Sequence, residues 1–223
     1  MNQEELLWLW GKTVKDDPRR YHPLLFHLLD VGHVAGLMWD EVLVDSARVR
    51  LARALGSTSA QARRHVVMLA AAHDVGKACP GFQFQGRGEA FGPKFLWARL
   101  ESTGLGQGTD TQNKPHSFVS AKALIRVLKA EDWKWQAPGQ AAKILAHITG
   151  AHHGTFPTSA ILNGYAEPTL GGASWDQARQ ALLEAVWRAL FGDSADGEAP
   201  LRCEEPLDAA LVPLLAGMIS VAD

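Results

Sequence analysis

The sequence predicts an all-α fold for its 223 residues. Apolar side chains recur at helical spacing in several long segments, and no segment alternates convincingly between apolar and polar residues as a half-buried strand would. Glycine, proline and polar residues gather between those segments, where turns are expected. Apolar residues make up 47% of the chain, which is enough for one substantial domain with its own core.

The first helix is expected over residues 24–43, where His27, Asp30 and His33 follow one another at intervals of three residues. Because residues three apart are neighbours on a helix, Asp30 could support His27 as a hydrogen-bond partner. His27 itself lies on an apolar helix face, where a histidine satisfied within the core is the ordinary interpretation. Histidines that match no motif are assigned structural roles: His22, His33, His65 and His147.

The second helix is expected over residues 59–74, with a serine or threonine at positions 57–59 as its cap. It is almost wholly apolar from residue 65 to residue 72 and then ends abruptly at His73 and Asp74. Burying a helix that ends on two ionisable neighbours is costly unless something binds them. Imidazole and carboxylate together suit a divalent metal ion, although a protonated histidine could also stabilise a helix C-terminus.

The rest of the chain follows a less regular pattern. Residues 79–115 are rich in glycine and aromatic residues, which predicts a loop with one short helix near residues 94–101. Further helices are expected over residues 117–131, 140–149, 175–190 and 207–222, and loops over residues 157–172 and 192–206.

The composition favours a cytoplasmic protein without a membrane partner. The longest apolar stretch, residues 209–222, contains Pro213 and is too short to span a bilayer. The first ten residues carry acidic side chains where an export signal needs basic ones. Two cysteines, Cys79 and Cys203, form no recognisable disulfide or metal-binding framework, which fits a reducing compartment.

Charge is distributed unevenly along the chain, although the net charge is only −2. Residues 77–143 hold ten basic and five acidic side chains, whereas residues 144–223 hold three and ten. The middle third could offer phosphate groups a positive surface, or it could be an ordinary solvated surface. A protein dedicated to binding duplex DNA would usually be more basic overall.

Five motifs give the chain a family resemblance. In order, they are FHLLDVGHVA, HDVGKACPGFQ, PHSFVSA, ITGAHHG and LLAGMISVAD. Together they resemble the HD nuclease domain of the CRISPR-associated nuclease–helicase of type I systems, within the HD phosphohydrolase superfamily. The opening WLWGKT resembles the start of the subtype that works with the Cascade surveillance complex. The HD and HHG elements are shared by the wider superfamily, whereas the FQ pair and the LLAGxxSxAD ending are more specific to this family.

The resemblance implies an HD-domain helical bundle with a central metal site, built as a single nuclease domain over residues 1–223. Two divalent ions would be bridged by Asp74, which the resemblance makes a catalytic residue. The first ion would be held by His27, His73, Asp74 and Asp223, and the second by Asp74, His116, His152 and His153. Mixed imidazole and carboxylate ligands favour Mn, Fe, Co or Ni over Mg, and the nucleophile would be an activated water.

Several of these residues also have ordinary structural interpretations. His116 follows Pro115 at a helix start and could lie on the surface, and His152-His153 could be an exposed loop pair. Asp223 is terminal and could fray. Lys77, the second catalytic candidate, could reach a phosphate or the developing charge, or could simply be a cation near a helix C-terminus.

The resemblance also implies an activity and partners. The domain would cut single-stranded DNA delivered by a helicase domain, in cis or in trans, after Cascade recruits the protein. No GxxxxGK[ST] motif is present, so helicase domains are expected to be absent from these residues. Because the family continues past the point where this sequence stops, truncation at the C-terminus is expected, with a natural stand-alone nuclease subunit as the alternative. The alternatives are a phosphohydrolase acting on nucleotides or cyclic phosphates and an inactive adaptor. One local departure is Ala151, which separates Gly150 from the histidine pair that commonly follows glycine directly in the family.

Overall fold

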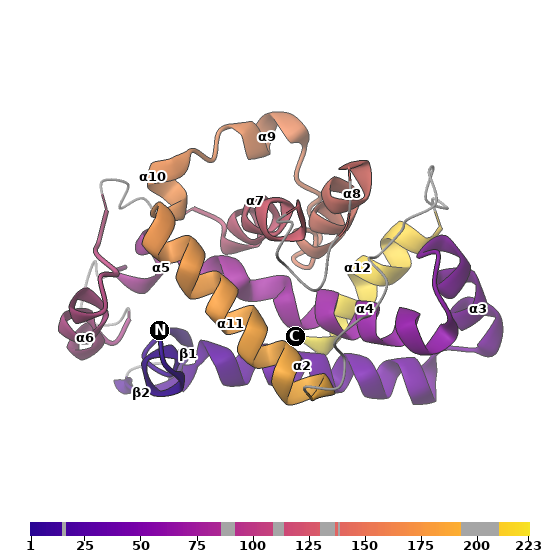
Figure 1. The fold of residues 1–223 in the computed structure, drawn as a ribbon, viewed down its shortest axis with the longest axis horizontal. Coiled ribbons are helices and arrows are strands. Elements are labelled where there is room, and N and C mark those ends of the chain that lie inside the picture. Colours follow the sequence, from indigo (N-terminus) through magenta and orange to yellow (C-terminus); the bar gives the residue numbers. More distant parts are fainter. Residues whose placement is uncertain (15–16, 86–91, 109–113, 130–136, 138, 193–209) are drawn as a thin grey trace.

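A computed structural model describes residues 1–14, 17–85, 92–108, 114–129, 137, 139–192 and 210–223 of the chain (Figure 1). Its secondary structure is mainly helical, with one short antiparallel hairpin. The long elements are α2 (Leu24–Leu37), α3 (Asp45–Ala54), α4 (Ser59–Ala71), α7 (His116–Lys129), α8 (Gly139–Thr149), α11 (Ala173–Phe191) and α12 (Leu211–Ala222). The short ones are α1 (Gln3–Leu6), β1 (Trp10–Val14), β2 (Asp17–Pro23), the π-helix η1 (Met38–Val42), the 3₁₀ segments η2 (Ala72–Lys77) and η3 (Lys94–Leu96), α5 (Pro80–Gln83), α6 (Trp97–Ser102), α9 (Ser159–Asn163) and α10 (Glu167–Leu170).

Helix α4 and the η2 segment that follows it lie at the centre of the fold, packed against α2, α7 and α11 (Figure 1). Helix α12 contacts α2, α4 and α8, so the end of the described chain returns to the middle of the molecule. Every residue from Val66 to Val75 is at most 2% exposed. The apolar run recognised in the sequence is therefore the core of the domain, and its polar end is buried with it.

The start and the end of α4 differ in character. Thr58 caps the start: its Oγ1 accepts from the Gln61 backbone N–H at 3.3 Å, and the Gln61 side chain accepts from the Thr58 N–H at 3.0 Å. This singles out Thr58 among the three candidate caps. The α-helix ends at Ala71, earlier than expected, and the tighter 3₁₀ segment η2 carries His73 and Asp74 onward.

The hairpin β1–β2 was not expected, because its residues do not alternate between buried and exposed. Trp10 and Gly11 are both buried, and the register shifts between Trp10 and Lys12 and again between Thr13 and Val14. A two-stranded hairpin is marginal without further packing. Here β1 also packs against α2 and η2. Tertiary contacts therefore stabilise a hairpin that the local sequence pattern does not predict.

Other differences concern short or polar helices. Helix α3 was not expected, and α5, α9 and α10 lie within segments expected to be loops. The helix expected over residues 117–131 begins one residue earlier, at His116, and is described to Lys129. Glu131, Cys203, residues 193–206 and residues 207–209, the start of the last expected helix, lie outside the described residues.

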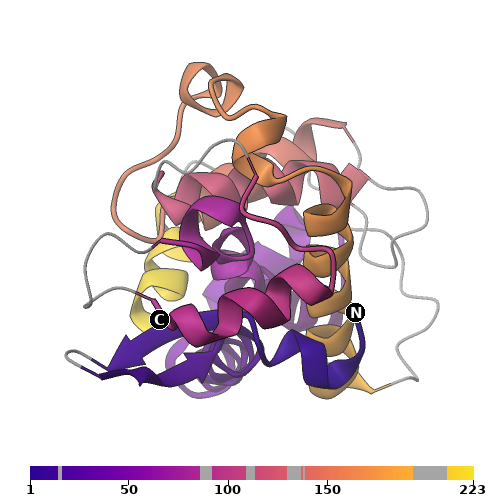
Figure 2. The ribbon, with the colours of Figure 1, turned by 90° about the vertical axis from the view of Figure 1, so that its left-hand side faces the viewer.

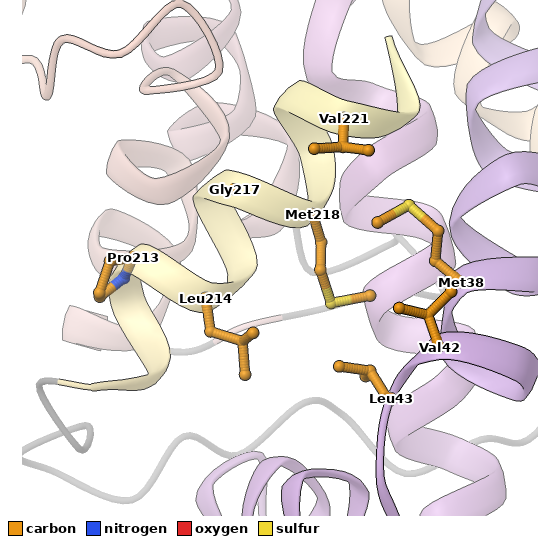
Figure 3. Close-up of a pocket in the computed structure, with 8 residues that line it drawn as sticks. All are labelled: Met38, Val42, Leu43, Pro213, Leu214, Gly217, Met218 and Val221. Carbon is orange, nitrogen blue, oxygen red and sulfur yellow. The ribbon is translucent and has the colours of Figure 1, made fainter.

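An apolar pocket of about 290 Å³ lies between η1 and α12 (Figure 3). Met38 and Val42 line it from one side, and Leu214 and Met218 from the other. None of the predicted metal ligands lines it. Within the described part of the chain, no helix is both long enough and apolar enough to cross a membrane.

Candidate metal centre

The candidate site begins where the buried helix ends. His73 and Asp74, on η2, are 0% and 1% exposed. The His73 ring bonds through Nδ1 to the carbonyl oxygen of Ala70, 2.8 Å away. Because that bond places the ring proton on Nδ1, the lone pair of Nε2 is directed into the site.

Asp74 lies between two groups of side chains, and each of its oxygens faces one of them. Oδ2 is 2.9 Å from His27 Nε2 and 3.3 Å from His73 Nε2. Oδ1 is 3.3 Å from His116 Nε2 and 3.5 Å from His152 Nε2. A carboxylate in this position can bridge two cations, one on each side.

The first group consists of His27, His73, Asp74 and Asp223, whose candidate ligand atoms all lie within 4.8 Å of one another. His27 comes from α2, and Asp223 follows the last turn of α12. Asp223 Oδ1 lies 3.4 Å from His27 Nε2 and 3.5 Å from His73 Nε2. Three elements far apart in the sequence thus converge on one point.

The second group consists of His116, His152 and His153, again with ligand atoms within 4.8 Å of one another. His116 is the first residue of α7, and the histidine pair follows α8. The Nε2 atoms of His116 and His153 are 2.9 Å apart. His152 bonds through Nδ1 to the Thr149 carbonyl at 2.8 Å, so its Nε2 is directed toward Asp74, as that of His73 is. Ala151 does not disturb this convergence.

Two glycines allow the supporting elements to approach closely. A Cβ on Gly76 would lie 2.2 Å from the backbone nitrogen of Ser120 and 2.5 Å from the carbonyl oxygen of His116, so η2 can touch α7 only with glycine there. A Cβ on Gly150 would lie 2.8 Å from the Cβ of Ala121. The Gly76 backbone N–H also donates to Ser120 Oγ at 2.8 Å. Glycine at these two positions therefore brings the second group to Asp74.

Three buried atoms at the site lack a hydrogen-bond partner among the described residues: His73 Nε2, Asp74 Oδ1 and His152 Nε2. Leaving such groups unsatisfied is costly, and native structures usually explain each one. All three are Lewis-basic atoms of the kinds that divalent transition metals bind, and they converge on the two groups. The donor set therefore fits metal ions on both sides of Asp74.

The electrostatics favour a cation. Burial alone would raise the pKa of Asp74, but the positive charge of His73 and the nearby imidazoles of His152 and His27 hold that pKa well below its usual range. Burial lowers the pKa of His116 to about 4. Burial would lower the pKa of His73 too, yet the carboxylates of Asp74 and Asp223 raise it to about 9. With no ion bound, a proton on Nε2 therefore supplies the positive charge, and a metal ion would displace that proton. The carboxylates are therefore ionised, and the buried site requires positive charge beside them.

Lys77 contributes part of that charge. Its ammonium lies 2.5 Å from Asp74 Oδ2, and the residue is only 6% exposed. The ammonium also lies 5.5 Å from the ring centre of Phe82. Lys77 is thus held at the first group.

All seven predicted ligands lie in the two groups, although their role as ligands stays a prediction. Asp30 is elsewhere: it pairs with His22 at 2.9 Å and not with His27. Sequence reasoning missed Lys12, which bonds to Asp223 at 3.1 Å, and Ser220, whose hydroxyl donates to the His152 carbonyl at 2.5 Å. Both residues lie in quoted motifs, WLWGKT and LLAGMISVAD, but no contact could be assigned to them from the sequence.

Comparison with known proteins gives consistent matches. A "CRISPR-associated endonuclease/helicase Cas3" of Thermus thermophilus is 34% identical over 190 residues, covering 84% of this chain and 19% of that protein. The chain therefore spans about a fifth of the length of this relative.

Three solved structures have the same fold over nearly the whole chain. A CRISPR-associated protein has a TM-score of 0.85 at 32% identity, covering 97% of this chain and 22% of its own. The Thermus thermophilus Cas3 HD domain in the presence of Ni²⁺ has a TM-score of 0.64 at 25% identity, covering 98% and 74%. A chain of a CRISPR RNA-guided surveillance complex in a pre-nicking state has a TM-score of 0.72 at 25% identity, covering 97% and 24%.

The family description "Cas3, HD domain" matches residues 10–223, which include all seven predicted ligands and both catalytic candidates. The matched range begins at strand β1 and runs to Asp223, so it contains both groups around Asp74. The chain belongs to the Cas3 HD domain family.

Proposed function

We propose that this domain is a metal-dependent nuclease that hydrolyses phosphodiester bonds of single-stranded DNA with two divalent ions. The observation that carries the proposal is the position of Asp74, whose two oxygens face separate groups of potential ligands. Two bound ions would supply charge neutralisation, activation of water and stabilisation of the leaving oxygen. Family membership supports the same reaction class.

The proposed ligands divide as the two groups do. His27, His73, Asp74 and Asp223 would hold one ion, and Asp74, His116, His152 and His153 the other. Five of these seven residues are histidines, which suits Mn, Fe, Co or Ni better than Mg. The related HD domain studied with Ni²⁺ is consistent with that preference.

The protein side chains would position the two ions and balance negative charge at the site. Asp74, fixed by the buried turn of η2, would keep the two ions at a constant separation. Lys77 would balance negative charge at the first group and, if it turns from Asp74, could contact the phosphate or the leaving oxygen. The apolar walls around η2 would exclude bulk water, which strengthens each electrostatic interaction there.

We infer the substrate from the exposure of the second group and the partners from family membership. The second group is the open side, because the His116 side chain is 25% exposed and His153 is exposed. A flexible single strand can bring a phosphodiester to such a rim more easily than a stiff duplex. We propose that a helicase domain, in cis or in trans, delivers the strand after Cascade recruits the protein in the cytoplasm. The helicase in the name of the curated relative and the surveillance-complex match support those partners.

The test is a cleavage assay with the purified chain. Matched single-stranded and duplex DNA are incubated with Mn²⁺, Co²⁺, Ni²⁺ or Mg²⁺, with and without ATP. We expect cleavage of the single strand with the transition metals, little cleavage with Mg²⁺, a largely spared duplex and no effect of ATP. Full activity with Mg²⁺ alone would contradict the ligand set. Faster turnover of mononucleotides or cyclic phosphates than of DNA would instead establish a phosphohydrolase.

A further inference from the structure

The N-terminal hairpin contacts the candidate metal centre through one side chain. The Lys12 ammonium, on β1, donates to Asp223 Oδ1 at 3.1 Å and to the Asp223 backbone oxygen at 3.3 Å. The two residues are 211 positions apart in the sequence. Figure 2 shows the hairpin beside the end of α12, where Asp223 lies. The contact therefore joins the two ends of the described chain.

Asp223 is the member of the first group that most needs support. Its side chain is 20% exposed, whereas the other side chains of that group are at most 4% exposed. It follows the last turn of a helix, where fraying is common. A carboxylate oxygen has two lone pairs, so Oδ1 can accept from Lys12 and still face His27 and His73.

A buried amide fixes the strand that carries Lys12. Gln83 is 0% exposed, and its Nε2 donates to the carbonyl oxygens of Trp10 and Lys77, both at 2.9 Å. Its Oε1 accepts from the Trp10 backbone N–H at 3.1 Å, and the Trp10 indole donates to the Gln83 carbonyl at 3.3 Å. Gln83 thus joins β1, two residues before Lys12, to the end of the segment that bears Asp74.

The strand also lies directly against the helix that carries His27. A Cβ on Gly11 would lie 3.2 Å from the Cα of Leu24 and 3.3 Å from the Cβ of His27. The position of β1 is therefore determined on one side by α2 and on the other by Gln83. A strand held in this way can present Lys12 at one point relative to the first group.

We propose that Lys12 is a positioning residue of the metal centre, which holds the Asp223 carboxylate in place for the first ion, and that Gln83 keeps β1 where Lys12 can do so. The proposal rests on the metal centre proposed above. Removing groups that support metal ligands typically weakens metal binding by roughly 10–100-fold. Repulsion between the Lys12 ammonium and the ion should reduce metal affinity by less than the support of Asp223 increases it. The reason is that Lys12 is 50% exposed, so solvent screens its charge.

The test titrates Mn²⁺ alone into the purified chain by calorimetry and compares Lys12→Met, Lys12→Arg and Arg19→Met. Arg19→Met is the matched control, because it removes a cation of the same hairpin that pairs with Asp17, outside both groups. We expect Lys12→Met to weaken one of two binding events by about tenfold and to leave the other unchanged. Lys12→Arg should recover most of that loss, and Arg19→Met should bind as wild type does.

Other outcomes would overturn the proposal. If Lys12→Met bound Mn²⁺ as wild type does and only its affinity for single-stranded DNA fell, Lys12 would be a substrate contact. Equal losses of Mn²⁺ affinity in Lys12→Met and Arg19→Met would indicate a general effect of the hairpin's charge. If wild type itself bound no Mn²⁺, the metal centre would be wrong, and this inference with it.

The Gln83 step has a separate test. Gln83→Met should weaken the same Mn²⁺ binding event as Lys12→Met. The double variant should lose less binding free energy than the two single variants lose together, because both residues act through Asp223. Additive losses would show that Gln83 does not act through Lys12. If Gln83→Met does not fold, Trp10→Phe is the substitute: it removes the indole donation and part of a buried ring but leaves the Gln83 amide bonds to the β1 backbone. It should weaken the same Mn²⁺ binding event by a smaller factor.

Discussion

The two groups on either side of Asp74 are built differently. The first is enclosed except at Asp223: His27 and His73 are at most 3% exposed and come from α2 and from η2, whereas the Asp223 side chain is 20% exposed. The second lies at the rim, where His116 begins a helix, His153 is exposed and only His152 is buried. An enclosed group suits tight retention of an ion, whereas an open one suits contact with substrate. One carboxylate can therefore serve two sites with different accessibility.

Asp74 is the residue on which both groups depend, so its replacement should have the largest effect. We expect Asp74→Ala to abolish cleavage and empty both sites, because Asp74 alone faces both groups. Asp74→Asn, which keeps the shape but not the charge, should be nearly as severe. Metal content by mass spectrometry and cleavage of single-stranded DNA measure the two effects. Near-normal cleavage by Asp74→Ala with Mn²⁺ would disprove the two-metal assignment.

Replacing one ligand from each group in turn should distinguish the metal affinities of the two sites. His27→Ala should weaken the enclosed site by at least about 100-fold, since even supporting groups account for roughly 10–100-fold. His153→Ala should weaken only the rim site. Two-site calorimetric titration with Mn²⁺ resolves the two events, and His33→Ala, an exposed histidine of the same helix as His27, serves as the control. If both variants weakened the same event, the division into two groups would be incorrect.

The smallest expected effect concerns support of the rim group from α12. Ser220 donates to the carbonyl of His152, and a hydrogen bond of this kind contributes about 1 kcal/mol to stability. Ser220→Ala should therefore lower the free energy of unfolding by about 1 kcal/mol and weaken the rim site several-fold, leaving the enclosed site unchanged. Denaturant unfolding and the same titration measure both. An effect confined to the enclosed site would mean that α12 supports only Asp223.

The fold class and the long helices other than α3 were predictable because they depend on local pattern. The apolar run before His73 and the Thr58–Gln61 capping box lie within a few residues of one another, so sequence alone indicates a buried helix ending in an ionisable pair. The hairpin was not predictable in this way. Its residues lack alternation, and its position depends on Gln83, 73 residues from Trp10.

For the candidate site, the sequence by itself determined which residue types are present, and the resemblance supplied their grouping. His73, Asp74 and Lys77 needed only local spacing, because they share one turn. Only the tertiary structure decided which oxygen of Asp74 faces which histidines, that Asp30 pairs with His22, and that Lys12 reaches Asp223. These contacts join residues brought together by helix packing, and packing depends on close approaches such as that at Gly76, which no local pattern encodes.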